Sequence, residues 1–123
     1  MKHAYMGNEQ QTIQFDEFRK LDIRIAEIVC AKDIPGSDKL LDLTVSLGDE
    51  ERRIIAGIKK SYSKEKLVGR KIVVVANIAP KNIMGFESRG MLMAAAIYMA
   101  DGEMDGVALL VPDGDPKPGT RIT

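Results

Sequence analysis

The stretch Leu41-Asp42-Leu43-Thr44-Val45-Ser46-Leu47 alternates apolar and polar residues with a period of two. Successive side chains of a β-strand point to opposite faces, so this pattern predicts a strand with one buried face. Gly48-Asp49-Glu50-Glu51 predicts the turn that follows, and Arg53–Ala56 predicts the returning strand. The two strands are therefore expected to form a hairpin.

Further strand signals lie on both sides of this hairpin. Ile23–Cys30 predicts a long strand that ends before the turn Ile34-Pro35-Gly36-Ser37. The run Ile72-Val73-Val74-Val75-Ala76 is mostly β-branched, which favours a strand buried on both sides. Pro80 and Gly85 predict a loop after it. Two later apolar runs complete the pattern, Met91–Ala96 and Val107–Val111.

Two short helices are predicted between these strands and the chain start. Asp16 can cap a helix over Asp16–Leu21, and Ser61 or Ser63 can cap a helix that ends at Leu67. Residues 1–14 are polar and without periodicity, so we expect a flexible N-terminal tail. The folded domain is then expected to span residues 15–123.

About six short strands with two brief helices favour a small antiparallel barrel or sandwich over alternating βαβ units. A five-stranded barrel of the oligonucleotide/oligosaccharide-binding (OB) type fits this number of strands and the ~100 ordered residues. We therefore expect an all-β OB-fold domain with short helices.

The charges are balanced overall but unevenly spread along the chain. The sequence of 123 residues has 18 Lys and Arg and 18 Asp and Glu, giving a net charge of zero. Residues 1–51 carry a net charge of −5, residues 52–89 a net charge of +8 and residues 90–123 a net charge of −3. The basic block 52–89 is either a solvated face or an anion-binding surface, and the pattern alone favours neither.

The sequence lacks the residues that several classes of function require. The single cysteine, Cys30, lies in an apolar strand pattern and is expected to be buried, and the single histidine, His3, lies in the predicted tail. We therefore predict no catalytic residues, no metal site and no cofactor. No apolar run approaches the ~20 residues that cross a bilayer, so we expect a cytoplasmic protein.

Three stretches together resemble a known family. They are Leu21–Ile25 leading to Ile34-Pro35-Gly36-Ser37-Asp38-Lys39-Leu40, then Arg53-Ile54-Ile55-Ala56-Gly57, and Asn77-Ile78-Ala79-Pro80-Lys81-Asn82-Ile83-Met84-Gly85-Phe86-Glu87-Ser88-Arg89-Gly90-Met91-Leu92. The chain is similar, over about Asp16–Ile122, to the tRNA-binding domain at the C-terminus of many methionyl-tRNA synthetases. The resemblance extends to the free-standing synthetase beta subunit and to the endothelial monocyte-activating polypeptide domain. Ile34 stands where that family often has histidine.

The resemblance implies an OB-fold barrel that binds tRNA without catalysis. It also implies a homodimer for free-standing members, with a C-terminal extension, here about residues 90–123, forming the interface. A methionyl-tRNA synthetase catalytic subunit is a further possible partner, because this chain lacks the nucleotide-binding signatures of a synthetase core. No membrane partner is expected.

Candidate RNA-binding residues follow from their chemistry and from the resemblance. Lysine and arginine contact phosphates, and the candidates are Lys39, Arg53, Lys81 and Arg89, with Lys59 and Lys60 in second rank. Each of these side chains has the alternative of being a solvated surface cation.

Three further candidates are uncharged. Asn77 and Ser88 can hydrogen-bond a base edge or a 2′-hydroxyl, and Met91 can lay its thioether on a base or ribose. Asn77 could instead fix the turn after its strand, and Met91 could instead fill the core. Because aromatic residues are few, we expect recognition of tRNA shape and backbone with limited sequence reading.

Two other functions stay open. A bacterial protein-export factor resembles the same family, so a chaperone dimer that binds unfolded peptides in an apolar groove is the alternative. An RNA chaperone without a synthetase partner is the third possibility.

Overall fold

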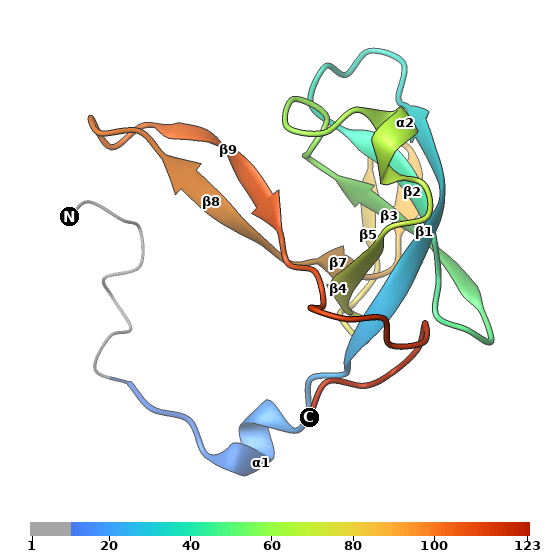
Figure 1. The fold of residues 1–123 in the computed structure, drawn as a ribbon, viewed down its shortest axis with the longest axis vertical. Coiled ribbons are helices and arrows are strands. Elements are labelled where there is room, and N and C mark those ends of the chain that lie inside the picture. Colours follow the sequence, from blue (N-terminus) through green and yellow to red (C-terminus); the bar gives the residue numbers. More distant parts are fainter. Residues whose placement is uncertain (1–10) are drawn as a thin grey trace.

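The computed structural model describes residues 11–123 of the chain, and an antiparallel five-stranded sheet forms its centre. The strand order is β3-β2-β1-β4-β7, and the sheet curls into a nearly closed barrel (Figure 1). Its strands are β1 (Ile23–Asp33), β2 (Leu41–Ser46), β3 (Glu51–Ala56), β4 (Lys71–Val75) and β7 (Met91–Leu92). The predicted all-β barrel is therefore confirmed.

The inward faces of these strands form one apolar core. Its most deeply buried large side chains are Ile28, Leu41, Leu43, Val45, Ile54, Leu67, Ile72 and Val74. Leu67 comes from the short helix α2 (Lys64–Leu67), which lies between β3 and β4 along the chain and packs onto β1. Burial of these aliphatic side chains is the main favourable contribution to folding.

Strand β1 runs three residues beyond the predicted end, because a β-bulge changes its register. Its first half pairs with β4 and its second half pairs with β2, with a shift between Ile28 and Cys30. The bulge turns Val29 outward and leaves Cys30 only partly buried, so the prediction of a buried Cys30 was wrong.

The barrel is closed by the segment that joins β6 (Phe86–Ser88) to β7. The Ser88 hydroxyl accepts a hydrogen bond from the Ile55 N–H at 3.0 Å, and the Arg89 N–H donates to the Arg53 carbonyl at 2.8 Å. Two residues later, Met91 pairs with Val75 of β4. This segment therefore bridges β3 and β4, the two strands that would otherwise be open edges.

The predicted loop around Pro80 and Gly85 contains a second sheet. Strands β5 (Lys81–Ile83) and β6 form a hairpin whose turn residues, Met84 and Gly85, have φ values of +51° and +87°. The Asn82 side chain accepts a hydrogen bond from the Gly85 N–H and stabilises the turn. Strands of three residues carry too little periodicity to be predicted from sequence.

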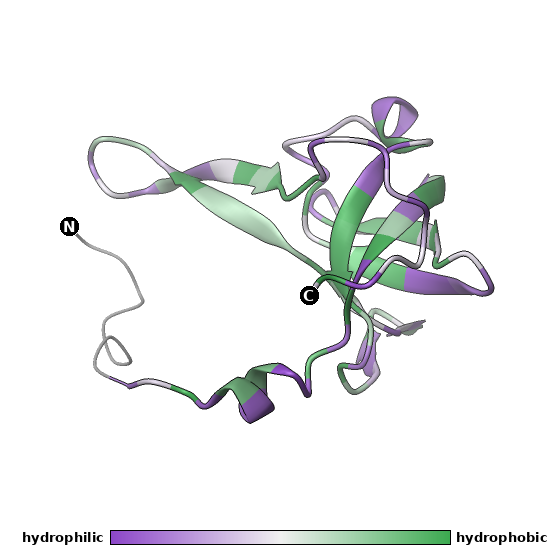
Figure 2. Cartoon of the chain, turned by 60° about the horizontal axis from the view of Figure 1, so that its bottom comes forward, coloured by the Kyte–Doolittle hydropathy of each residue, from purple (hydrophilic) through white to green (hydrophobic). Residues whose placement is uncertain are grey.

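A third sheet extends away from the barrel. Strands β8 (Ala94–Tyr98) and β9 (Met104–Leu109) form a hairpin whose tip carries Asp101 and Glu103 (Figure 1). Its base is attached to the barrel, because the Tyr62 hydroxyl accepts a hydrogen bond from Leu109 and the Ser61 hydroxyl accepts one from Val107. All five residues of β8 are exposed, although four of them, Ala94–Ile97, are apolar (Figure 2).

Both predicted helices exist but are shorter than expected. Helix α1 (Phe15–Phe18) begins after Gln14 rather than Asp16, because Gln14 and Glu17 form a reciprocal capping box. Helix α2 begins after Ser63, one of the two predicted caps. Residues 1–10 of the predicted tail lie outside the described residues. None of the helices within 11–123 is long and apolar enough to cross a membrane.

Residues 119–122 complete the edge of β1 that β2 leaves unpaired. The backbones of Ile23 and Ile25 exchange hydrogen bonds with this segment. Beside them, Arg24 forms a two-pronged hydrogen bond to Asp22, at 3.0 Å and 2.9 Å. This guanidinium lowers the pKa of Asp22 from its ordinary value of 3.8, and Arg121 adds to the effect.

Replacing Ser88 should destabilise the barrel. In Ser88→Ala the buried Ile55 N–H loses its hydrogen-bond acceptor, and we expect a loss of about 1–3 kcal/mol in the free energy of unfolding. Urea unfolding followed by circular dichroism measures it. Ser63→Ala is the matched control, because this exposed hydroxyl makes no capping hydrogen bond. Equal stabilities of the two variants would contradict the role given to Ser88.

Asp22 should make stability depend on acid pH. Its pKa is lowered in the folded state, so its contribution is complete above the unfolded pKa and is lost as the pH falls below about 4. Asp22→Asn should reduce stability by about 0.5–1 kcal/mol at pH 7 and flatten the decline on acidification. Unfolding curves between pH 7 and pH 2.5 test this. Asp16→Asn is the control, because Asp16 belongs to an exposed ion pair whose charged atoms lie 4.0 Å apart. This variant should lose stability on acidification as steeply as the parent does.

Candidate nucleic-acid interface

A hollow of about 380 Å³ lies between the end of β3 and the β5–β6 hairpin. Its walls include three of the seven predicted site residues, namely Lys81, Ser88 and Met91. The rest of the lining is mostly apolar and comprises Ile55, Ala56, Gly57, Ile78, Ala79, Ile83, Gly90 and Leu92.

Two neighbouring hollows share walls with the first. One, of about 520 Å³, is lined by Asn77 and shares Ile78, Ala79 and Met91 with it. The other, of about 350 Å³, is lined by Lys39 and Lys60 and shares Gly57. We call the three together the groove. Five of the seven predicted residues therefore line three hollows that share wall residues, although they lie far apart in sequence.

The groove occupies the position at which OB-folds bind their ligands. Lys39 lies in the connection between β1 and β2, whereas Asn77, Lys81 and Ser88 lie in the connection between β4 and β7. In OB-folds the equivalent two loops and the face of the second and third strands form the binding surface. The fold thus brings these predicted residues to the loops that bind ligands in other OB-folds, and their role in binding stays a prediction.

Three of the predicted cations are unrestrained. Lys39, Lys81 and Arg89 are exposed, and none of them forms an ion pair with another residue of the described range 11–123. An exposed cation without a protein partner keeps its full charge for a phosphate. These three residues are the strongest candidates for phosphate contacts.

Ser88 and Asn77 are both engaged within the protein. Ser88 is only 5% exposed, and its hydroxyl closes the barrel as described above. The Asn77 side-chain oxygen accepts a hydrogen bond from the Asp22 N–H at 2.8 Å, and its amide donates to the Lys20 carbonyl at 2.7 Å. The structural alternative weighed for Asn77 therefore has a geometric basis, because the side chain joins the end of β4 to the start of β1.

Arg53 lies beside the groove and is held from two sides. Its Nε donates to the Asp42 carboxylate at 3.1 Å, and its guanidinium lies 4.9 Å from the centre of the Phe86 ring. Asp42 is buried beneath it, although the alternating pattern of residues 41–47 predicts an exposed side chain. Neither Asp42 nor Phe86 carried a sequence signal for this role, since strand pairing and the β5–β6 hairpin bring them to Arg53.

The basic block does not form one uniformly positive face. Six of its ten cations pair with acidic side chains from the acidic segments on either side in sequence. The pairs are Arg52–Glu50, Arg53–Asp42, Lys59–Asp33, Lys60–Asp38, Lys64–Asp33 and Lys71–Asp115. Lys59 and Lys60, the second-rank candidates, are both in this paired group.

These pairs shift the ionisation of their acidic members. Hydrogen bonds from Lys64 and Lys59 lower the pKa of Asp33, and Arg52 lowers the pKa of Glu50. Both carboxylates therefore remain charged throughout the neutral range and offset the neighbouring cations. Within residues 11–123, no group of three or more His, Cys, Asp or Glu side chains could hold a metal ion.

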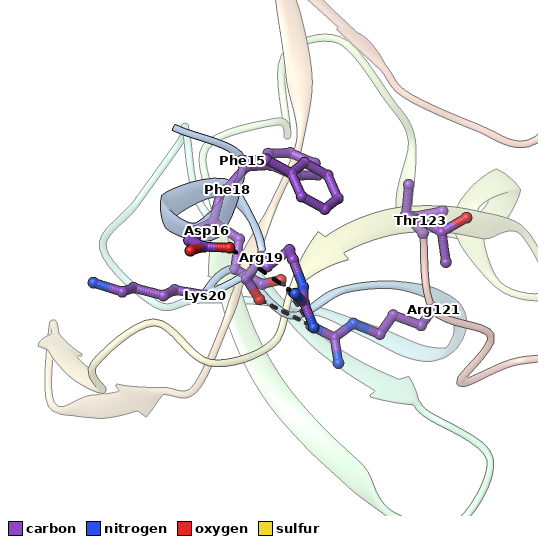
Figure 3. A pocket seen from close by; sticks show the side chains of 9 residues that line it. Phe15, Asp16, Phe18, Arg19, Lys20, Arg121 and Thr123 are labelled. Atoms are coloured by element: carbon purple, nitrogen blue, oxygen red, sulfur yellow. Dashed lines mark hydrogen bonds and ion pairs between the residues drawn. The ribbon is translucent and has the colours of Figure 1, made fainter. Parts of the chain in front are cut away.

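Another hollow, of about 670 Å³, lies elsewhere, between α1 and Arg121–Thr123 (Figure 3). The rings of Phe15 and Phe18 lie together on one wall, and Arg121 donates hydrogen bonds to the Arg19 and Leu21 carbonyls. None of the seven predicted site residues lines this cavity. We therefore do not take this hollow as the candidate site, despite its volume.

Comparison with known proteins finds relatives that match nearly the whole chain. A family model described as "Putative tRNA binding domain" matches residues 23–121. The methionine–tRNA ligase of Thermococcus kodakarensis is 47% identical over 116 residues, which cover 94% of this chain and 15% of that protein. The ligase of Thermotoga maritima is 46% identical over 115 residues, covering 94% and 17%. The chain thus spans only about a sixth of the length of these curated relatives.

Solved structures give the same relationship. A MetRS-related protein from Pyrococcus horikoshii superposes with a TM-score of 0.81 at 33% identity, covering 93% of this chain and all of that one. The chaperone CsaA from Bacillus anthracis superposes with a TM-score of 0.78 at 30% identity, covering 91% and 99%. With the family match over residues 23–121, these findings show that the chain belongs to the tRNA-binding domain family.

Proposed function

We propose that this chain is a non-catalytic tRNA-binding module whose groove receives the RNA. The observation that supports this most directly is that Lys81 and Met91 line one hollow and Lys39 lines an adjoining one, beside the two loops through which OB-folds bind their ligands. Lys39, Lys81 and Arg89 contact phosphates, and the apolar wall beside Met91 accommodates a ribose or an unstacked base.

The resulting affinity depends on few charges. Because most cations of the basic block are paired, the number of phosphates that the protein neutralises is small. Binding is therefore modest and falls as salt rises, in proportion to the few counterions released. Shape recognition by the barrel, rather than bulk charge, selects tRNA.

The cellular role we propose is that of the beta subunit or free-standing C-terminal domain of a methionyl-tRNA synthetase. The relatives that are named methionine–tRNA ligase match this chain over about a sixth of their own length. A module that binds tRNA beside a catalytic subunit raises the local concentration of its substrate and needs no chemistry of its own. This role belongs to the cytoplasm.

A chaperone function is the second candidate. The supporting observation is that the groove wall formed by Ile55, Ile78 and Ile83 is apolar, and CsaA shares this fold. Such a wall can bury apolar side chains of an unfolded peptide. In that case the cations around the groove contribute less to the binding free energy than the apolar wall does.

We further propose a homodimer formed through residues 90–123. The β8–β9 hairpin extends from the barrel and exposes Ile97, Met99 and Met104. Apolar side chains gathered on a projecting hairpin favour contact with another surface. A second copy of the chain is the partner that the resemblance to free-standing members implies.

Removing one groove cation should weaken RNA binding and reduce its salt dependence. For Lys81→Ala we expect the slope of log affinity against log salt to fall by about one unit, because one phosphate contact is lost. Fluorescence anisotropy with labelled tRNA measures this slope. A titration from about 25 to 300 mM salt is wide enough to distinguish the slopes of the parent and the variant. Lys66→Ala is the matched control, since Lys66 is also exposed but lies on α2, outside the groove.

Each outcome of this titration discriminates between the candidates. An unchanged slope for Lys81→Ala together with a reduced slope for Lys66→Ala would contradict the groove as the RNA site. Binding of an unfolded peptide by the parent, with no tRNA binding at the lowest salt, would favour the chaperone function instead.

The proposed dimer predicts a solution mass of twice the chain's 13.5 kDa. Light scattering after gel filtration measures this mass. Ile97→Glu places a charge on the exposed hairpin and should produce the monomer while the circular dichroism spectrum stays unchanged. A parent protein that is monomeric at micromolar concentration would exclude the dimer.

A further inference from the structure

Arg53 differs from the other candidate cations in how firmly it is held. Its Nε donates a hydrogen bond to the carboxylate of Asp42, a side chain that is only 11% exposed. Its guanidinium packs against the Phe86 ring. The Arg53 side chain is nevertheless 48% exposed. Within residues 11–123 its two terminal nitrogens make no hydrogen bond of their own. A planar donor edge is thus fixed in orientation and open to solvent.

We propose that Arg53 reads the edge of a nucleobase, with a preference for an unpaired guanine, and that Asp42 and Phe86 are its positioning residues. This inference rests on the proposed function, in which the groove binds RNA. It gives Arg53 a different role from the phosphate contact expected from sequence.

The charge around Arg53 supports base reading over phosphate binding. The buried Asp42 carboxylate partly offsets the guanidinium charge, so a phosphate approaching this pair meets a weaker attraction than at a cation without an acidic partner. A base edge is neutral and needs only donors in the correct geometry. The guanidinium fork matches the O6 and N7 acceptors of guanine and is the commonest specific contact to that base.

The surroundings of Arg53 also suit an extruded base. Arg53 and Ile55 lie on the same outer face of β3, and Ile55 lines the groove. The Arg53 carbonyl accepts a hydrogen bond from the backbone of Arg89, whose side chain is an unpaired cation. A phosphate held by Arg89 would therefore place its nucleotide next to the guanidinium. The Phe86 ring covers one side of the guanidinium plane and keeps the donor edge directed outward.

The test separates base preference from salt dependence. The probes are four labelled single-stranded RNA octamers of uridine, three of which carry one central G, A or C. We expect the parent to bind the G-containing octamer about 5- to 150-fold more tightly than the others. Arg53→Lys keeps the cation opposite Asp42 but loses the planar fork, so this preference should disappear while the salt slope is retained.

A charge-neutral pair of substitutions gives the sharper comparison. Asp42→Asn combined with Arg53→Gln removes both charges and leaves the net charge of the face unchanged, so the guanine preference should be lost and the salt slope kept. Lys81→Ala is the matched control and should do the opposite, lowering the slope and keeping the preference. Circular dichroism verifies folding of the double variant, and Arg53→Lys carries the test if that variant unfolds.

The possible results separate this inference from the proposed function. If the parent binds no RNA at low salt, the proposed function fails before any variant is compared. If the parent binds all four octamers equally, or Arg53→Lys keeps the guanine preference, the inference is overturned and the groove remains an RNA site. A fall of about one unit in the salt slope of the double variant would likewise identify Arg53 as a phosphate contact.

Discussion

The fold and the candidate site both depend on how the barrel is closed between β3 and β4. Ser88 and Arg89 attach the chain to β3, and Met91 attaches it to β4. Gly90 lies between them at a φ of +134°, where a Cβ would come within 3.2 Å of Ile54 and 3.4 Å of the Val75 carbonyl. A residue with a side chain would be strained there, and the two attachments could not be spaced so closely. Arg89 and Met91 in this segment are both exposed, so one short segment completes the barrel and supplies part of the proposed binding surface.

Charge pairing then decides which cations are available to a ligand. The acidic segments 1–51 and 90–123 fold back onto the basic block, and their carboxylates neutralise most of it. Exposed ion pairs of this kind add little to stability. Their main effect is on the field that a ligand meets. Among the described residues they leave four cations of the block without an ion pair, and only Lys81 and Arg89 of these four lie in the connection between β4 and β7. A net charge of zero is therefore compatible with a localised phosphate-binding edge.

Sequence reasoning succeeded where one strand face is buried and periodicity is strong. The strands around residues 23–30, 41–47, 53–56 and 72–76 were predicted within a few residues, since aliphatic side chains at every second position have only one way to reach a common core. The β5–β6 hairpin was missed because its strands have three residues each, and the bulge at Val29 was missed because it arises from strand pairing. Asp42 was misjudged for the same reason, since its burial depends on Arg53 from the next strand.

The site could be predicted in part, because two loops of an OB-fold converge wherever they lie in the sequence. Lys39 and Lys81 were therefore found together, whereas the partners of Arg53, Lys59 and Asn77 were not, since each depends on a tertiary contact without local signal. The same distinction separates the two functions considered for the groove, RNA binding and peptide binding. An apolar floor gains free energy from any buried apolar surface, and strong salt does not weaken that gain. Unpaired cations at its rim act only on charged ligands and are screened within about 8–10 Å at physiological salt. Within residues 11–123 the rim keeps Lys39, Lys81 and Arg89 without an ion pair, and this is why we propose RNA rather than peptide as the ligand.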